Sequence, residues 1–508
     1  MGKHCLKFIV FASFIFGIAA SAQKCPPDNW CQIYSKPLLR NNGYNAIFFA
    51  PGVNKFFLYA GNTNAPATLA NGPEGTTFWE YSLHDTPVST NPWTQLSDCN
   101  DNANTEIRQQ MLKLHRAMSE TDTTAELCVG QSCAAALTPQ NTIPQEGFAW
   151  IGDESISYKG CTGVEPATPG ACGRGTKIFR LDNVARGVRQ PAGWRPAYAH
   201  AVGEQANLSC PAPTLHQTPT IDHPPSRHSA QNATFDSLRG AIWLAWGWQE
   251  NWSLQDTWYL CLKETAFCTA TKIRDGWQRL PLFSSQGEEP GNYAENATIY
   301  DPDNDVLVSF GGLKGGNATS ETFVFCLSDK AYGCSARTLN KWVKVATHGN
   351  PGPRDAARLA YDKVNHRILA FGGQGNSATG FYNSVAIYNA ATGDWCLSET
   401  GVGGASNASS CKYPKMTGTP PPRERSTKFP SWCFDGTRGK GAFFNGKNIY
   451  EYDTAKNEWI LTKAPEGPTG GAFTQQSHQS WAHDDVNDVF VWVSSAQLWQ
   501  LPGAALSK

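Results

Sequence analysis

The feature that most constrains the fold of this chain is a phrase that returns about every sixty residues. It is clearest at 358–373, where RLAYDKVNHRILAFGG reads as two apolar strands joined by a polar turn and ended by two glycines. An aromatic strand at 384–388 and Trp395 follow. A strand-only repeat of this period is typical of a β-propeller, because one four-stranded blade cannot bury both of its faces without neighbours.

Six cycles of this phrase can be traced along the chain. Their first strands are expected at 44–50, 232–236, 297–301, 358–362, 432–435 and 478–484. The sixth cycle lacks an outer strand, and we predict that residues 29–34 supply it. Such a pairing would join the two ends of the chain and cover strand edges that otherwise invite aggregation.

Several details of the repeat resemble the kelch repeat family. They are the glycine pair after an apolar strand, the later Tyr and Trp at fixed offsets, and a Pro/Arg entry at 225–227, 353–354 and 422–423. The resemblance is best in the second to fourth cycles, while the fifth has 444–446 (FNG) in place of the glycine pair. It implies an all-β, six-bladed kelch-type propeller closed by its N- and C-terminal strands. It implies no particular activity, because such propellers carry unrelated functions.

A long insertion at 98–210 separates the first cycle from the second. At 105–118 the apolar residues have the spacing of one helix face: Ile107, Met111, Leu114 and Met118. We therefore expect an amphipathic helix there, within a small, disulfide-rich α+β module. Long insertions on one rim of a repeat scaffold are frequent carriers of function.

The predicted organisation follows from these features. A signal peptide occupies 1–22, a closing strand and the first blade 23–97, the inserted module 98–210, and blades two to six 211–508. Cys99 and Cys210 lie at the two roots of the insertion. We predict a disulfide between them that would staple the insertion to the propeller.

The first residues have the pattern of a secretory signal peptide. Lys3 and Lys7 precede an apolar run at 8–20, and small residues stand just before Gln23. No later stretch approaches the roughly 20 apolar residues that a membrane-spanning helix needs. We expect a soluble protein, secreted to the extracellular space or the periplasm, without a membrane span.

The sixteen cysteines fit an oxidising compartment better than cytosolic metal sites. Two cycles place a cysteine pair around a short turn, so we predict hairpin disulfides Cys261–Cys268 and Cys326–Cys334. Looser local pairings are Cys396 with Cys411, Cys161 with Cys172, and Cys128 with Cys133, which leaves Cys25, Cys31 and Cys433 unassigned.

The overall charge points away from nucleic acid and from anionic membranes as partners. The formal net charge is −1 and the pI is about 6.8, so the chain as a whole has no basic footprint. We expect an extracellular protein or a glycan as the partner.

Three arginines stand at the starts of blades, where the innermost strand would line the central channel: Arg227, Arg354 and Arg423. Their guanidinium groups could converge on a carboxylate, a sulfate or a cluster of sugar hydroxyls through forked hydrogen bonds. The alternative is that each one ties neighbouring blades together through main-chain carbonyls. Trp252, in the turn of a tryptophan-rich hairpin, is a further candidate for sugar stacking.

We expect no metal and no cofactor, and we favour a binding or interaction protein, acting through the insertion and the channel rim, over an enzyme. The alternative is a kelch-type enzyme, such as a copper radical oxidase of carbohydrates or alcohols that resembles galactose oxidase. That site needs a Tyr-His pair late in the propeller, and no Tyr-His dipeptide occurs in this sequence. The likeness to those oxidases therefore extends to the scaffold alone.

Overall fold

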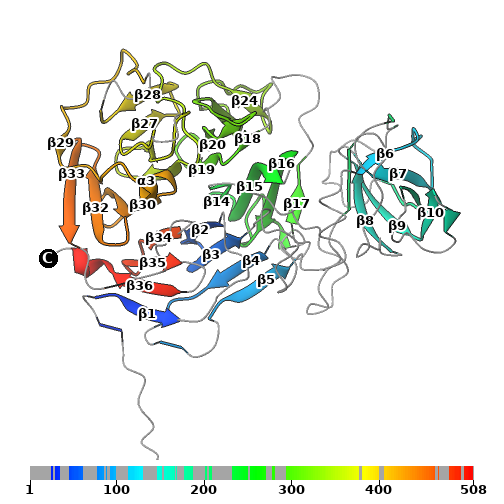
Figure 1. The fold of residues 1–508 in the computed structure, drawn as a ribbon, viewed down its shortest axis with the longest axis horizontal. Coiled ribbons are helices and arrows are strands. Elements are labelled where there is room, and N and C mark those ends of the chain that lie inside the picture. The colour runs from blue at the N-terminus through cyan, green and yellow to red at the C-terminus, as the bar shows by residue number, and fades with distance from the viewer. Residues whose placement is uncertain are drawn as a thin grey trace, which may run out of the picture.

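The computed structural model describes residues 25–26, 29–34, 45–60, 77–84, 87–88, 92–98, 112–129, 146–151, 154–165, 167–168, 177–186, 199, 201–202, 205–208, 231–249, 252–270, 277–280, 293–376, 380–399, 405–463, 467, 480–493 and 497–506. Within these ranges nearly all regular structure is strand, arranged in several small antiparallel sheets (Figure 1). The all-β class expected from the repeat is therefore confirmed. The predicted signal peptide at 1–22 lies outside the described residues.

Six of the described sheets begin with a strand at the place that the repeat predicts. These first strands are β2 (Asn45–Ala50), β14 (Ala233–Asp236), β19 (Ala297–Asp301), β25 (Arg358–Asp362), β30 (Ser431–Asp435) and β34 (Ser480–Asp484). In each sheet the strands then pair side by side in chain order.

The remaining strands of these sheets lie outward from the first. They are β3 (Lys55–Ala60), β4 (Thr77–Tyr81) and β5 (Thr94–Asp98); β15 (Ala241–Gln249), β16 (Trp252–Cys261) and β17 (Trp277–Arg279); β20 (Val306–Phe310), β23 (Thr322–Cys326) and β24 (Trp342–Lys344); β26 (Arg367–Phe371), β27 (Val385–Asn389) and β28 (Asp394–Leu397); β31 (Lys440–Phe444), β32 (Asn448–Asp453) and β33 (Glu458–Lys463); β35 (Val489–Val493) and β36 (Leu498–Pro502). A short strand, β29 (Thr417–Gly418), adds to β33 in parallel.

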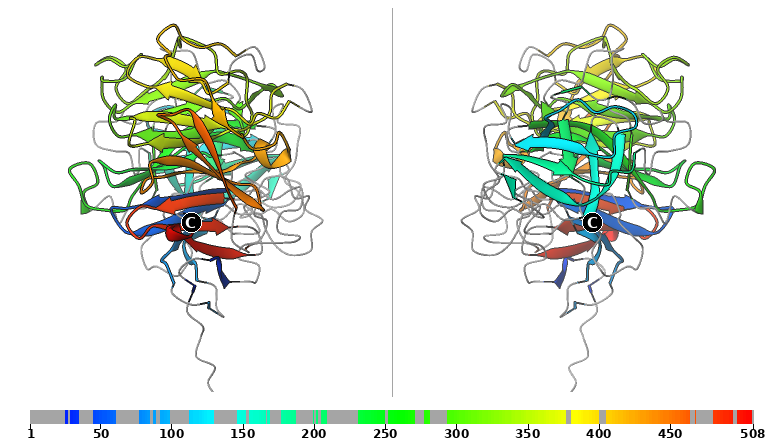
Figure 2. Two further views of the ribbon diagram at one scale, coloured as in Figure 1. Left: turned by 90° about the vertical axis from the view of Figure 1, so that its left-hand side faces the viewer. Right: turned by 90° about the vertical axis from the view of Figure 1, so that its right-hand side faces the viewer.

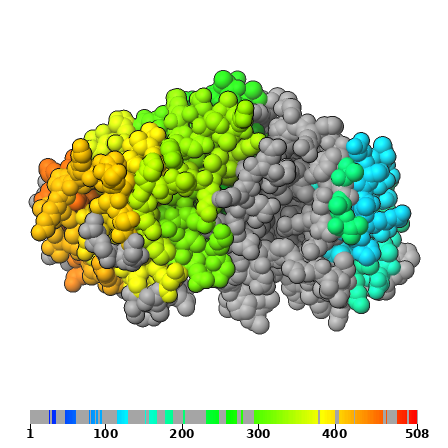
Figure 3. Space-filling view, turned by 90° about the horizontal axis from the view of Figure 1, so that it is seen from above, coloured from blue at the N-terminus to red at the C-terminus, as the bar shows by residue number. Residues whose placement is uncertain are grey.

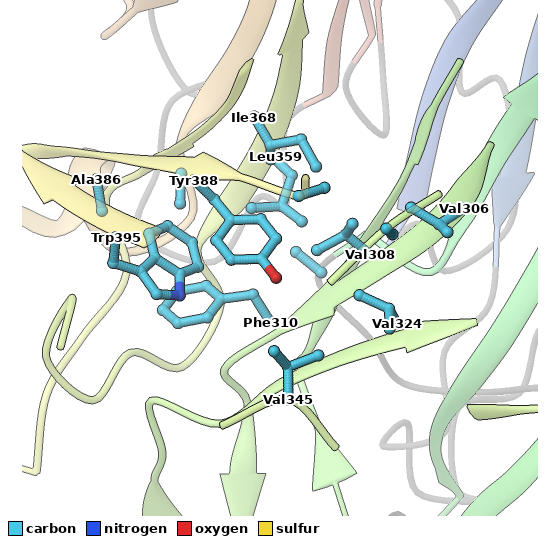
Figure 4. Packing of buried hydrophobic residues seen from close by; sticks show 14 of the residues in the cluster. Val306, Val308, Phe310, Val324, Val345, Leu359, Ile368, Ala386, Tyr388 and Trp395 are labelled. Atoms are coloured by element: carbon cyan, nitrogen blue, oxygen red, sulfur yellow. The ribbon is translucent and has the colours of Figure 1, made fainter. Parts of the chain in front are cut away.

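Neighbouring sheets contact one another through their first strands and share apolar cores. β2 contacts β14, β14 contacts β19, β19 contacts β25, β25 contacts β30, β30 contacts β34, and β34 contacts β2. A separate buried cluster fills the space between each of these pairs of sheets. Between the third and fourth sheets, Phe310 lies against Tyr388 and Trp395 (Figure 4). Burial of large aromatic side chains at these faces stabilises the packing of neighbouring sheets.

The two ends of the chain share one sheet. β1 (Cys31–Tyr34) pairs antiparallel with β36, with Gln32 opposite Trp499. The N-terminal strands, coloured blue, accordingly lie beside the C-terminal strands, coloured red, in every ribbon view (Figures 1 and 2). The prediction that residues 29–34 supply an outer strand beside the C-terminal strand is confirmed by this pairing.

The same side-chain contact recurs at the end of five first strands, where an aspartate binds the turn to the second strand. One carboxylate oxygen of each aspartate accepts hydrogen bonds from two backbone N–H groups of the turn. The five aspartates are Asp236, Asp301, Asp362, Asp435 and Asp484. This is the usual reason for aspartate at such turns, because its short side chain satisfies the turn's own backbone.

The insertion forms an eight-stranded sheet with a core of its own. Its order is β11 (Ala167–Thr168), β10 (Cys161–Glu165), β12 (Ile178–Leu181), β7 (Ala125–Val129), β6 (Leu112–Leu114), β13 (Gln205–Leu208), β8 (Glu146–Ile151) and β9 (Glu154–Lys159). A buried cluster that includes Leu127, Ile156 and Phe179 fills it. Its described residues, cyan and teal, lie at the opposite end of the surface from the orange strands of the fifth sheet (Figure 3).

The helix predicted at 105–118 is wrong where the structure describes it. Residues 112–114 form β6, which pairs with β7 on one side and β13 on the other. Backbone pairing on both edges outweighs the helical spacing of the apolar residues, because tertiary contacts override local propensity. The described part of the insertion is therefore β structure and not α+β.

Three small elements complete the described chain. A three-stranded sheet consists of β18 (Tyr293–Ala294), β21 (Leu313–Lys314) and β22 (Asn317–Ala318). The helical elements are α3 (Arg425–Lys428) and the 3-10 helix η2 (Gly503–Leu506). In the part of the chain that the structure describes, no helix has the length and apolar character needed to cross a membrane.

Candidate functional site

Three ionisable side chains meet where the neighbouring first strands β19, β25 and β30 begin. They are Glu295, Asp355 and Lys428, and we call them the rim cluster. The carboxyl groups of Glu295 and Asp355 share a hydrogen bond, and Lys428 Nζ lies 3.4 Å from Asp355 Oδ2. Each residue lies in the segment before the first strand of a different sheet, so the cluster exists only when the three sheets are packed together.

The local backbone holds the Asp355 carboxyl group in place and links the Glu295 and Asp355 segments. Asp355 exchanges backbone hydrogen bonds with Gln374, at 2.8 and 3.0 Å, and its Oδ1 accepts a further one from the Gln374 N–H at 3.0 Å. Glu295 has a φ of 55° and Ala356 a φ of 54°, and the Ala356 N–H donates to the Glu295 carbonyl. Left-handed backbone at residues other than glycine costs energy and is enriched at functional sites.

Burial changes the acidity of this carboxyl pair. Glu295 is 7% exposed and Asp355 4% exposed. Burial, followed by repulsion from Glu295, raises the pKa of Asp355 to about 7, although Lys428 acts in the opposite direction. Burial likewise raises the pKa of Glu295. The pair therefore holds a proton near neutral pH and can both donate and accept hydrogen bonds, as two carboxyl groups in contact commonly do.

Lys428 connects the pair to the surface. Its side chain is 22% exposed, and its Nζ lies 4.9 Å from the centroid of the Phe429 ring. The cation offsets part of the negative charge when the pair ionises. A ligand that reaches the partly exposed Lys428 side chain would thus contact an ammonium group beside two carboxyl groups that share a proton.

A glutamine joins two first strands that are not neighbours. Gln231, just before β14, donates from Nε2 to the Leu359 carbonyl of β25 at 3.0 Å, and its Oε1 accepts from the Leu359 N–H at 2.7 Å. This bridge ties the segment before β14 to β25 directly.

Arg354, one of the predicted site residues, lies in the protein interior. It is 1% exposed, and it donates to the carbonyls of Pro351, Gly372 and Ser384 at 3.0 to 3.3 Å. Its guanidinium also lies 4.3 Å from the centroid of the Tyr382 ring. Burial lowers its pKa to about 10, which leaves it protonated at neutral pH. These contacts favour the structural interpretation, with the bonds made within one repeat and not between repeats.

The other predicted site residues differ in how far the structure describes them. Arg423 is 47% exposed; its Nε donates to Asn383 Oδ1 at 3.0 Å, and its Nη2 lies 3.6 Å from Glu399 Oε2. The side chain of Trp252, at the start of β16, and the whole of Arg227 lie outside the described part. Convergence of the three arginines stays a prediction.

The expected disulfides can be compared with the structure in part. Cys261–Cys268, Cys326–Cys334 and Cys396–Cys411 are bonded. Cys25 and Cys31, left unassigned by the sequence, also pair, and Cys433 is a free thiol. Cys128 and Cys161 are disulfide-bonded, but their predicted partners Cys133 and Cys172 lie outside the described residues, as do Cys99 and Cys210.

Among the described residues, one group of side chains is close enough to hold a metal ion. It consists of Asp435, His483 and Asp488, whose ligand atoms lie within 4.8 Å of one another. Arg438 donates to both aspartates, at 2.7 to 2.9 Å, and so already supplies a cation there. The group lies at the turn ends of β30 and β34, away from the rim cluster at the start of β30.

Sequence reasoning did not find the rim cluster. Its three residues are far apart in the chain, and none belongs to a motif. Each stands just before a first strand, but charged residues are common in these segments, as the arginines at 354 and 423 show, so position alone did not mark the cluster. A comparison of the chain with models of known protein families finds no match.

Proposed function

We propose that this chain is a secreted, six-bladed β-propeller of kelch type that binds an extracellular partner at the rim cluster. Six first strands that contact one another in cyclic order support the propeller, together with six apolar cores between neighbouring sheets. The pairing of β1 with β36 would close it without leaving an open strand edge. The four described disulfides support an oxidising compartment.

The observation that carries the binding proposal is the buried Glu295–Asp355 pair beside Lys428. Two buried acids in contact destabilise a fold, since burial disfavours their charged forms. Chains retain such arrangements mainly where they serve a function. A group that donates and accepts hydrogen bonds next to an ammonium matches the hydroxyl clusters of sugars, so a glycan is the favoured ligand, and an extracellular protein is the second candidate.

Loss of either charge of the rim cluster should weaken binding. We expect Asp355→Asn and Lys428→Met each to reduce affinity for the ligand about tenfold or more, because each removes a hydrogen bond to a charged group. The ligand is first identified by a glycan array and by capture of extracellular proteins, and affinity is then measured by calorimetry. Asp303→Asn is the matched control, since Asp303 lies at the turn end of β19, and it should bind like wild type. Unchanged binding by both rim variants would exclude the rim cluster as the site.

The Asp355→Asn substitution, which should weaken binding, should also make the fold more stable at neutral pH. Because the pKa of Asp355 is raised, the folded protein binds more protons than the unfolded chain between about pH 4 and pH 7. This group therefore makes wild-type stability fall as pH rises through that window. We expect Asp355→Asn to be more stable than wild type at pH 7, by up to about 4 kcal/mol because each unit of the pKa shift corresponds to about 1.4 kcal/mol, and no more stable at pH 4. Urea unfolding at both pH values measures this difference; a variant that is destabilised at pH 7 would contradict it.

Metal analysis separates this proposal from the enzymatic alternative. The full-length protein, purified and dialysed, is analysed by mass spectrometry for copper, zinc and iron. Stoichiometric copper would favour an oxidase and overturn the non-catalytic proposal. In the described residues, the only set of potential ligands in reach of one ion is the group around Arg438.

A further inference from the structure

A histidine is enclosed between the turns of the last two sheets. The His483 side chain is fully buried. Its Nδ1 lies 2.7 Å from Asp485 Oδ1, and its Nε2 lies 3.1 Å from Asp488 Oδ1. The ring also packs against Phe490, with centroids 4.4 Å apart. His483 is thus held on both nitrogens and on one face.

The hydrogen bonds require a particular protonation state. A carboxylate can only accept hydrogen bonds, whereas a neutral imidazole has a single N–H to donate. Two carboxylate partners, one at each ring nitrogen, are both satisfied only by the imidazolium form. Neutral His483 would turn a lone pair toward one of its two aspartates.

Both aspartates are fixed as acceptors by further donors. Asp488 accepts from Arg438 Nη1 and Nη2 at 2.9 and 2.8 Å. Asp485 accepts from Lys363 Nζ at 2.7 Å and from the Gly436 N–H at 3.0 Å. These bonds favour ionised carboxylates, and they join the turn after β34 to the turns after β30 and β25.

The charges around the ring balance only when it is protonated. The turn after β30 contributes Asp435, with Oδ1 3.7 Å from His483 Nε2, and Arg438. The turn after β25 contributes Lys363, and the turn of His483 itself contributes Asp485 and Asp488. The Asp484 carboxylate accepts hydrogen bonds from its own turn, and Cys433, on β30, is a half-buried free thiol. Without the imidazolium, the three carboxylates facing the ring outnumber the two cations.

We propose that His483 is a pH-sensitive latch that, when protonated, holds the sheet containing both chain ends against the neighbouring sheet. Its partners lie in the turns after β25, β30 and β34, so loss of the proton weakens the contact between the sheet of β34 and the neighbouring sheet of β30. The inference does not depend on the ligand or on the rim cluster.

The direction of the pKa shift of His483 agrees with this geometry. Burial acts to lower the pKa of His483, but the hydrogen bond to Asp485 and the charges of Asp435 and Asp485 more than offset it, so the pKa is raised. The stabilisation is therefore complete below the unfolded value of about 6.5 and is lost as pH rises through the folded pKa.

The latch is tested on the full-length protein by thermal melts and by amide hydrogen exchange between pH 5.5 and pH 9. After correction for intrinsic exchange at each pH, we expect exchange of β34 and β35 to accelerate above pH 6.5, by up to about tenfold per pH unit until the folded pKa is reached. His483→Gln should lose this dependence. The control is His366→Gln, because His366 is 62% exposed beside Asp303, and it should retain the wild-type profile.

Two outcomes would overturn the latch. One is a His483→Gln variant with the same pH profile as wild type. The other is read on wild type alone, so it stands even where the variant does not fold. Hydrogen–deuterium exchange at the imidazole Cε1–H, followed by mass spectrometry, gives the pKa of His483 directly; a value at or below 6.5 would remove the basis of the proposal, whereas a higher value supports it.

Discussion

Replacement of Trp30 by alanine is expected to lower the free energy of unfolding by about 3 to 5 kcal/mol, the usual cost of deleting a buried aromatic side chain. Trp30 is 4% exposed. Its ring lies 5.1 Å from Phe444, 5.6 Å from Trp481 and 6.4 Å from Trp499, between centroids. The side chain thus joins the N-terminal strand to the last two sheets, and its loss leaves a cavity between them.

The measurement is urea unfolding followed by tryptophan fluorescence and circular dichroism. Trp30→Phe is the matched control, because it keeps an aromatic ring in the same space, and it should cost clearly less. The N-terminal strand should also become accessible to protease in the alanine variant. A Trp30→Ala protein that unfolds like wild type would show that this strand adds little to the fold.

Alanine at Gly372 should be comparably damaging, at about 3 to 5 kcal/mol, for a steric reason. Gly372 has a φ of +70°, and a Cβ there would lie 2.3 Å from the Thr427 carbonyl oxygen and 2.9 Å from Pro430 Cγ. The first contact is to backbone of the next repeat, which cannot rotate away. Strain from left-handed backbone adds about 1 to 2 kcal/mol to this overpacking.

Gly315→Ala separates the two contributions. Gly315 has a similar φ of +58°, but a Cβ there would have no heavy atom within 4 Å. We expect this variant to lose only the conformational part, about 1 to 2 kcal/mol. Thermal melts of both variants give the comparison. Equal losses in the two would mean that close approach of neighbouring sheets at Gly372 is unimportant.

The strands of the repeat were predictable because their signals are local. Apolar runs such as those of β25 and β26 are joined by a turn whose aspartate, Asp362, satisfies its own backbone. The glycine pair that follows marks the close approach seen at Gly372. The strands, the turn and the glycine pair all lie within one short stretch of chain, although the segment that approaches Gly372 belongs to the next repeat.

The features that the sequence did not predict depend on how separate segments pack together. Residues 112–114 form a strand because β7 and β13 flank them, and neither partner can be deduced from helical spacing. The rim cluster joins three separate sheets, so its geometry depends on packing that no single segment encodes. Arg354 was a candidate ligand-binding residue because of its position before a first strand, yet its guanidinium donates hydrogen bonds to nearby backbone carbonyls.

The pairing of β1 with β36 also sets an order of events during synthesis. Of the described strands, β1 comes first in the chain and its partner β36 comes last, so β1 has no partner while the strands between them are made. A chain that stalls before residue 498 offers β1 no edge to join. The β1–β36 pairing therefore requires synthesis to have passed residue 498, and shorter chains would leave β1, with Trp30 beside it, without this partner.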